Sequence, residues 1–379
     1  MPTRQGWVML AAAAVAVITG RVFGLIELFV IGVALAGALL SAIVIVNRPF
    51  PRLEVRRVLR PPMVSVGEPA RVDLQVTNRA GFHSPRLKLW EPVGHRGGAP
   101  MQLAPLASGE SCTAAYRVPT THRGVLQTGP LRAERTDPLG LVMRSRWMAG
   151  ADEVTVVPER VPLRFPAVGS GGRLGEHLRM KAYGQTGHEF HSQREYAPGD
   201  DLRRINWKTT ARVGTLIVRE TAQEGIRHCT VVLDAAVDAY DDADAFERAV
   251  SAAASAVASA AAAGVTTRLV APGIDLRGPE VAPQSLRWLA TVQAGGDTVD
   301  HTAGGHGHAD GIGLVVVITG RSGSRAAVAA ASRVGPDEAL IMVTTSRSPE
   351  SGKGFQVDCT SLLAFADGWN ELVLGRSAT

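Results

Sequence analysis

Cysteine and aromatic residues are scarce in this chain of 379 residues, which has three cysteines and 5% aromatics. Cys112, Cys229 and Cys359 are odd in number and widely spaced, which argues against a disulfide framework and favours a reducing compartment. Hydrophobic residues make up 45% of the chain and many are small, so the sequence can still form cores. The length predicts about two to three domains.

Familiar catalytic motifs are also missing. The Gly352-Lys353 pair is followed by Gly354 and lacks the upstream glycine of a Walker motif. No Gly-x-Ser-x-Gly elbow occurs, and the glycine-rich stretch 169–175 does not fit the dinucleotide fingerprint. The histidines of the glycine-rich insert 295–311 are expected to bind metal only adventitiously. These absences predict a protein that is not an enzyme and needs no cofactor.

Two long apolar runs stand at the start of the chain, at residues 7–20 and 22–46. About 20 apolar residues cross the hydrocarbon of a bilayer, and Arg21 can extend the shorter run by reaching the interface. We therefore expect two transmembrane helices within residues 1–50, with a tight turn near 19–24. A cleavable signal peptide is the alternative, but the second run that follows directly disfavours it.

Basic residues predict the orientation of this hairpin. Arg4 precedes the first run and only Arg21 lies in the turn, whereas a basic cluster follows the second run. The cluster consists of Arg48, Arg52, Arg56, Arg57 and Arg60. The positive-inside rule then places both ends, and the soluble domains, on the cytoplasmic side of the plasma membrane. The cluster, and the net charge of +5, are also suited to anionic lipid headgroups.

Residues 51–160 have the pattern of short strands separated by Gly and Pro. Residues 71–78 alternate with period two, which places Val72, Leu74 and Val76 on one face. Strands and turns at this spacing predict a β-sandwich-like domain without long helices. The segment 136–141 is expected to be a turn shaped by Asp137 and Gly140, with a recognition loop as the alternative.

Alternating strands and helices follow from about residue 226 to the end of the chain at 379. Strands are expected at 226–234, 266–271, 312–319 and 340–345, and helices at 243–263, 285–294 and 325–333. This alternation predicts a parallel sheet covered on both faces. Ligands of such sheets bind beyond the carboxyl ends of the strands, where Asp234 and Thr319 stand.

The segment 161–225 is expected to be a linker followed by an unusual motif. The motif, at 194–220, surrounds Tyr196 and Trp207 with arginines, and Pro198-Gly199 begins an acidic turn. One interpretation is an internal ion-pair network, and the other is a docking surface for an acidic partner. The interleaved acids argue against nucleic acid as the partner. The candidate partner-binding residues are Arg194, Glu195, Tyr196, Gly199, Asp200, Asp201, Arg204, Trp207, Lys208 and Arg212.

This motif resembles the signature of the domain of unknown function 58 family, and the order of helical hairpin, β-rich block and α/β block is similar to that family. In the family the position of Asn206 is commonly Asp, so a carboxylate is lost here. The resemblance implies a membrane protein that partners a MoxR-type AAA+ ATPase, often together with a transglutaminase-like membrane protein.

The α/β block, 226–379, is similar to a von Willebrand factor A domain. Such domains often hold a divalent ion through an Asp-x-Ser-x-Ser turn, and the matching stretch here begins at Asp234 and ends at Asp238 without either serine. Gly320 stands where such domains often have Asp. The resemblance implies at most a degenerate Mg²⁺ site formed by Asp234, Asp238 and Thr319.

The sequence thus predicts a membrane-anchored scaffold or adaptor for an AAA+ ATPase in envelope or complex assembly. Two alternatives stay open. One is an envelope enzyme with an anion-binding site at the motif, and the other is a ligand-sensing module that depends on a divalent ion.

Overall fold

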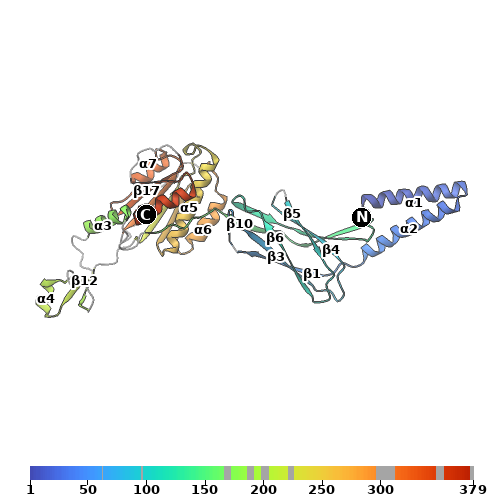
Figure 1. Ribbon diagram of the computed structural model, residues 1–379, viewed down its shortest axis with the longest axis horizontal. Helices are drawn as coiled ribbons and strands as arrows, with labels where there is room; N and C mark the ends of the chain where they lie inside the picture. Colours follow the sequence, from blue (N-terminus) through green and yellow to red (C-terminus); the bar gives the residue numbers. More distant parts are fainter. Residues whose placement is uncertain are drawn as a thin grey trace. The chain divides into compact units, whose positions relative to one another are not determined.

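The computed structural model describes residues 1–61, 63–94, 97–165, 172–185, 192–197, 205–220, 226–295, 312–346 and 354–375. The chain divides into two compact units, Met1–Val157 and Pro158–Thr379. The first unit contains the two apolar helices and a β-rich block, and the second contains an α/β block (Figure 1).

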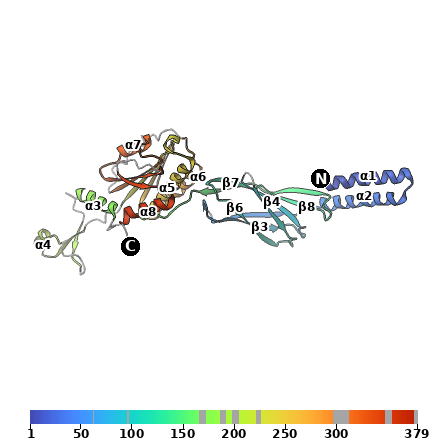
Figure 2. The same cartoon turned by 45° about the horizontal axis from the view of Figure 1, so that its top comes forward.

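Two helices, α1 (Arg4–Phe23) and α2 (Ile26–Asn47), form an antiparallel hairpin in which they lie side by side (Figure 2). Gly24 ends α1 with a φ of 73°, a left-handed conformation that suits glycine. Both helices are long and apolar enough to cross a membrane, with mean hydropathies of 1.8 and 2.8. The two expected apolar helices are therefore present, and most of their large side chains face outward.

The β-rich block consists of two sheets. Its strands are β1 (Leu53–Arg60), β2 (Val64–Ser65), β3 (Ala70–Asn78), β4 (Leu87–Val93), β5 (Gly97–Leu103), β6 (Ser111–Val118), β7 (Gly124–Thr128), β8 (Leu131–Thr136), β9 (Met143–Ala149) and β10 (Asp152–Val157). One sheet has the order β1-β3-β6, and the other β2-β10-β7-β4-β8-β9 with β5 beside β4. Side chains from both sheets, such as Leu74 and Leu131, share one core. No helix occurs among the described residues of this block.

The start of helix α1 is joined to the β8–β9 hairpin by hydrogen bonds. The Thr3 hydroxyl caps α1 and donates to the Gly140 carbonyl at 2.7 Å, and the Thr3 amide donates to Leu141. The Asp137 carboxylate accepts the amides of Leu139 and Val142, which fixes the turn between the strands. Gly140 has a φ of 71°. The turn expected at 136–141 is thus confirmed, and the N-terminal end of α1 is hydrogen-bonded to it.

The second unit is built on a sheet of order β15-β14-β13-β16-β17-β18. The strands are β13 (His228–Leu233), β14 (Thr266–Ala271), β15 (Ile274–Arg277), β16 (Gly313–Thr319), β17 (Glu338–Thr344) and β18 (Phe355–Asp358). All neighbours are parallel except β15, which is antiparallel to β14. Fully buried strands such as β13 and β16 explain the continuous apolar runs in the sequence.

Helices pack on this sheet. They are α3 (Arg173–Gln185), α5 (Ala243–Ala262), α6 (Val281–Thr291), α7 (Arg325–Ser332) and α8 (Leu362–Leu374), with a short 3-10 helix at Val237–Ala239. The segment 158–165, of which 161–165 was expected to belong to a linker and 158–160 to the β-sandwich-like domain, lies along α5 and α8. There the Val161 and Leu163 amides donate to Ser255 and Ser259, and the Trp369 indole donates to the Arg164 carbonyl. Trp369 therefore anchors this segment to the second unit.

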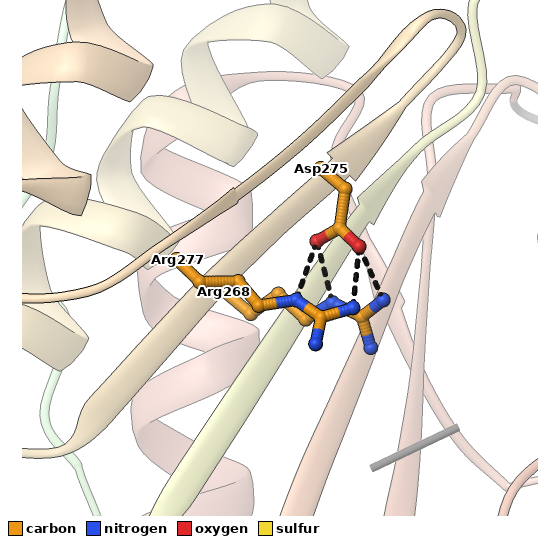
Figure 3. Close-up of polar contacts among 3 residues, drawn as sticks. All are labelled: Arg268, Asp275 and Arg277. Atoms are coloured by element: carbon orange, nitrogen blue, oxygen red, sulfur yellow. Dashed lines mark hydrogen bonds and ion pairs between the residues drawn. The ribbon is translucent and has the colours of Figure 1, made fainter. Parts of the chain in front are cut away.

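The antiparallel edge of the sheet brings two arginines opposite each other. Arg268 on β14 is the ladder partner of Arg277 on β15. Both guanidinium groups fork onto the carboxylate of Asp275, with Nη2–Oδ2 distances of 2.7 Å and 2.5 Å (Figure 3). One carboxylate thus bridges two cations, and the charge-assisted contacts lower the pKa of Asp275 well below its usual value.

Candidate functional site

The motif at 194–220 folds into a small sheet of its own. Strands β11 (Ser192–Glu195) and β12 (Ile217–Glu220) are antiparallel, with Glu195 opposite Ile217. On the other side of β12, Ile205 forms a bridge with Val218. The buried side chains of Ile205, Ile217 and Val218 form its apolar interior. The motif is therefore a folded element, with β12 as its central strand.

Helix α4 (Trp207–Val213) begins at a buried asparagine. The Asn206 side-chain oxygen accepts the Thr209 amide at 3.4 Å, and the backbone amide of Asn206 donates to the Ile217 carbonyl at 2.8 Å. Asn and Asp are about equally good at this capping position, so an Asp at position 206 is expected to cap α4 in the same way. Gly214 ends the helix with a φ of 81°.

The outer surface of α4 carries an aromatic residue and two cations. No residue of α4 is buried, and Trp207 is 65% exposed. Lys208 and Arg212 are also exposed and stand one helical turn apart, which places them on the same face. Val213 and Leu216 extend the exposed apolar surface next to them. We call Trp207, Lys208, Arg212, Val213 and Leu216 the α4 surface.

The other predicted residues of the motif are placed only in part. Glu195 is exposed and Tyr196 is half-buried, and the Tyr196 amide donates to the Leu216 carbonyl at 2.8 Å. Arg194 belongs to β11 by its backbone. Gly199, Asp200, Asp201, Arg204 and the side chain of Arg194 lie outside the described residues. The predicted ion-pair network depends on them and stays a prediction.

The second candidate site lies at the carboxyl ends of β13 and β16, which are adjacent parallel strands. The Thr319 hydroxyl donates to Asp234 Oδ2 at 2.9 Å, and the Ala236 amide donates to Oδ1 at 3.0 Å. Both side chains are buried. The Ser324 hydroxyl lies 3.1 Å from that of Thr319. The sheet topology thus unites two residues that are 85 positions apart in the sequence.

The residues around Asp234 do not fit a magnesium site. Magnesium requires near-octahedral oxygen ligands, and here one carboxylate and two hydroxyls meet. Asp238 is exposed on the short 3-10 helix, and in the described part of the chain no hydrogen bond or ion pair joins it to Asp234 or Thr319. A Cβ on Gly320 would lie 1.9 Å from the Ala239 carbonyl oxygen, so an aspartate is not tolerated there without a backbone shift.

The remaining acids of this region have other partners. Asp241 forms an ion pair with Arg321 at 2.5 Å, and hydrogen bonds from Arg321 and Ser346 lower the pKa of Asp241. Asp242 accepts the Ala245 amide at 2.6 Å and caps α5. Within the described ranges, no group of three or more His, Cys, Asp or Glu side chains is arranged to hold a metal ion. Asp242 therefore serves to start helix α5, with Asp244 in its first turn.

Comparison with known proteins supports the family resemblance over part of the chain. Residues 192–277 match the model of a family described as protein of unknown function DUF58. The matched region covers the small sheet, α4 and the first half of the α/β sheet. No curated protein matches the chain.

Solved structures resemble the chain only distantly. The CARDB domain of the PF1109 protein from Pyrococcus furiosus is 20% identical over 30% of this chain and 99% of that domain, with a TM-score of 0.22. A β-glucosidase from Listeria innocua is 12% identical over 29% of this chain and 16% of the enzyme, with a TM-score of 0.19. Scores this low carry no argument about function.

Proposed function

We propose that the protein is a membrane-anchored, non-enzymatic adaptor whose α4 surface docks a partner protein. The observation that carries the proposal is the exposure of Trp207 on a helix that buries none of its own residues. Exposed tryptophan and arginine are the residue types that most often dominate binding energy at interfaces. Lys208 and Arg212 add positive charge beside it, which favours an acidic partner surface.

The small sheet gives this surface a rigid support. Backbone hydrogen bonds join β11 to β12, and the Thr210 hydroxyl accepts the Ile217 amide at 3.0 Å, which ties α4 to β12. Because these contacts are internal to the motif, side chains on the outside of α4 are not needed for its folding. These exposed side chains are therefore available to contact a partner protein.

The proposed partner is a MoxR-type AAA+ ATPase, by the resemblance to the DUF58 family, in envelope or complex assembly. In this proposal the hairpin of α1 and α2 spans the plasma membrane, the β-sandwich-like and von Willebrand A-like blocks face the cytoplasm, and the α4 surface meets the ATPase. A transglutaminase-like membrane protein is the second proposed partner. The length and composition of both helices support the anchoring.

A quantitative binding measurement tests the adaptor proposal. The full-length protein is solubilised in mild detergent, and its affinity for the purified MoxR-type ATPase from the same organism is measured. Trp207→Ala is expected to weaken binding about 30-fold, the loss of a central aromatic anchor. Lys208→Glu/Arg212→Glu is also expected to weaken binding, and the loss of affinity is expected to be larger at low salt than at high salt.

The matched control is Trp147→Ala, because Trp147 is 62% exposed and lies on β9 in the other unit. This variant is expected to bind like the wild type. Equal affinities for the Trp207 and Trp147 variants, with both proteins folded, would remove the α4 surface as the docking site. No measurable binding by the wild type would reject the ATPase as the partner.

A further inference from the structure

Three arginines gather where the β-rich block meets the helical hairpin. Arg135 on β8 and Arg144 on β9 are direct ladder partners. Arg48 directly follows α2 as its C-cap residue. We call Arg48, Arg135 and Arg144 the arginine cluster. Like charges directly opposite each other in a sheet are destabilising, so the arrangement needs a compensating negative charge.

Part of the compensation comes from the carbonyl end of α2. Arg135 Nη1 donates to the Arg48 carbonyl at 2.9 Å, and its Nη2 donates to the Pro49 carbonyl at 3.2 Å. Arg144 Nη1 donates to the Asn47 carbonyl at 3.4 Å. A helix C-terminus carries roughly half a negative charge, which offsets only a fraction of three full positive charges.

In the part of the chain that the structure describes, the cluster has no acidic partner. Throughout the described ranges, no carboxylate forms an ion pair with any of its three arginines. The same hairpin has two carboxylates: Asp137 accepts two backbone amides, and Glu134 pairs with Arg132. Arg135 is 5% exposed, and its Nε is buried without a hydrogen-bond partner among the described residues. Burial, with the charges of Arg144 and Arg48, lowers the pKa of Arg135.

The second unit contains a similar cross-strand pair of arginines, and there a carboxylate of the chain binds both members. Arg268 and Arg277 are also opposite each other, and both are held by Asp275 (Figure 3). No acid takes the place of Asp275 beside Arg135 and Arg144 in the described part of the first unit. An anion from outside the chain is therefore suited to supply the negative charge that the described residues do not provide.

The position of the cluster indicates the source of that charge. The cluster lies at the C-terminal end of α2, a helix with the length and composition of a membrane span. Arg48 and Arg144 are exposed there. Arg4 is exposed in the first turn of α1, which is seated on the same hairpin, and a cation there opposes the helix dipole. Both helix ends thus present positive charge at one level of the molecule.

We propose that the arginine cluster binds the phosphate of an anionic phospholipid headgroup, in the leaflet that faces the β-rich block. Arg48 and Arg144 contact the phosphate, and the buried charge of Arg135 behind them raises the local positive potential. This inference rests on the membrane anchoring in the proposed function, and not on the α4 surface. Guanidinium groups suit it because they bind phosphate oxygens in a planar, two-pronged geometry.

The site differs from the basic run that the sequence suggested for lipid contact. Arg57 is paired with Glu91 and Asp152, and Arg60 is paired with Asp73, all within the β-rich block. Those two charges are already neutralised. Arg135 and Arg144 instead come from β8 and β9, about ninety positions later in the chain than the carbonyl groups of Arg48 and Asn47 to which they donate.

Lipid binding to the full-length protein tests the proposal. The purified protein in mild detergent is titrated with phosphatidylglycerol or phosphatidylcholine, and native mass spectrometry measures each dissociation constant. The wild type is expected to prefer phosphatidylglycerol. Arg48→Gln/Arg144→Gln is expected to weaken phosphatidylglycerol binding about 25-fold, at about fivefold for each arginine near the lipid surface, and to leave phosphatidylcholine binding unchanged.

Two control variants make the result specific. Arg277→Gln removes the same charge from another cross-strand arginine pair and is expected to bind like the wild type. Arg48→Lys/Arg144→Lys keeps the charge and is expected to recover most of the affinity. Equal binding of the two lipids by the wild type, or equal phosphatidylglycerol binding by the folded glutamine variant, would overturn the proposal.

A separate readout distinguishes this failure from a failure of the proposed function. Membranes containing the wild type are washed with alkaline carbonate, which removes proteins that do not span the bilayer. Release of the wild type would reject the anchoring, and the lipid site with it. Retention with equal affinity for both lipids would reject the lipid site alone.

Discussion

A buried ion pair shows how much a single residue contributes to the β-rich block. Glu91 has no exposed side-chain surface, and its carboxylate accepts Arg57 Nε at 2.5 Å. Arg57 also binds Asp152, which is 60% exposed. When one partner of a buried pair is removed, the other charge stays buried without compensation, and this costs far more than the loss of an exposed pair.

Glu91→Gln is therefore expected to lower the free energy of unfolding of the β-rich block by about 3 kcal/mol. The matched change is Glu54→Gln, because Glu54 pairs with Arg79 at 2.7 Å with both side chains more than half exposed. That change is expected to cost about 0–1 kcal/mol. Denaturant unfolding of the full-length variants measures both. A similar loss for the two variants would contradict the importance of burial.

Asp275 is expected to make the second unit sensitive to acid. Hydrogen bonds from Arg268, and then from Arg277, lower the pKa of Asp275 in the folded state. A carboxyl group with a depressed folded pKa stabilises the protein fully above its unfolded value of about 4, and this stabilisation is lost as the pH falls through the folded pKa. Asp275→Asn is expected to be less stable at pH 7 and to lose less on acidification below about pH 4. Urea unfolding across this pH range tests it, and parallel pH profiles would count against it.

At the scale of elements, the apolar pattern predicted the α/β block well. The helix expected at 243–263 is α5 (Ala243–Ala262), and the strand expected at 266–271 is β14 (Thr266–Ala271). The helix expected at 285–294 starts earlier, as α6 (Val281–Thr291), because Pro283 is tolerated in the first turn. Long buried elements carry their periodicity in the sequence, so their type is predictable.

Short or polar elements were not predictable in the same way. Edge strand β15 contains Arg-Asp contacts in place of an apolar run, and α3 is polar and follows a glycine-rich stretch. Helix α4 depends on the Asn206 cap and on β12, which is a tertiary contact. The arginine cluster depends on the register of β8 and β9. None of these relations is visible in local sequence.

Glycines set the distance between the two apolar helices. A Cβ on Gly32 would lie 2.8 Å from the Val17 backbone nitrogen, whereas a Cβ on Gly37 of the same helix would meet no atom within 4 Å. Close helix contacts through small residues are typical of membrane hairpins. Gly32 is therefore packed closely against α1, whereas Gly37, on the same helix, has open space beside it.

Gly32→Leu is expected to separate α1 from α2, and Gly37→Leu is expected to leave them in contact. A short bifunctional maleimide crosslink between cysteines introduced at the exposed positions Val15 on α1 and Val33 on α2 reports the separation by its rate of formation. A several-fold slower rate is expected for Gly32→Leu alone. Unchanged rates in both variants would show that the contact at Gly32 does not control the packing.

At the scale of the whole molecule, the two units have separate hydrophobic cores. The first unit's core joins residues of its two sheets, such as Leu74 and Leu131. A cluster in the second unit joins Val317 and Met342 of adjacent strands to Ala327 of α7. Units with their own cores are able to unfold independently, and changes in one then leave the other's stability unaltered.

Trp369→Ala is expected to reveal this independence. Trp369 is fully buried, its ring centroid lies 5.5 Å from that of Phe165, and its indole nitrogen donates to the Arg164 carbonyl at 2.6 Å. Its truncation is expected to cost the second unit about 3–5 kcal/mol and to release the 158–165 segment. In the full-length protein, calorimetry is expected to show two transitions, with one lowered by Trp369→Ala and the other by Glu91→Gln. A single transition lowered by both changes would mean that the units unfold together. Two separate transitions would show that the α4 surface and the arginine cluster can be altered by mutation without disturbing each other.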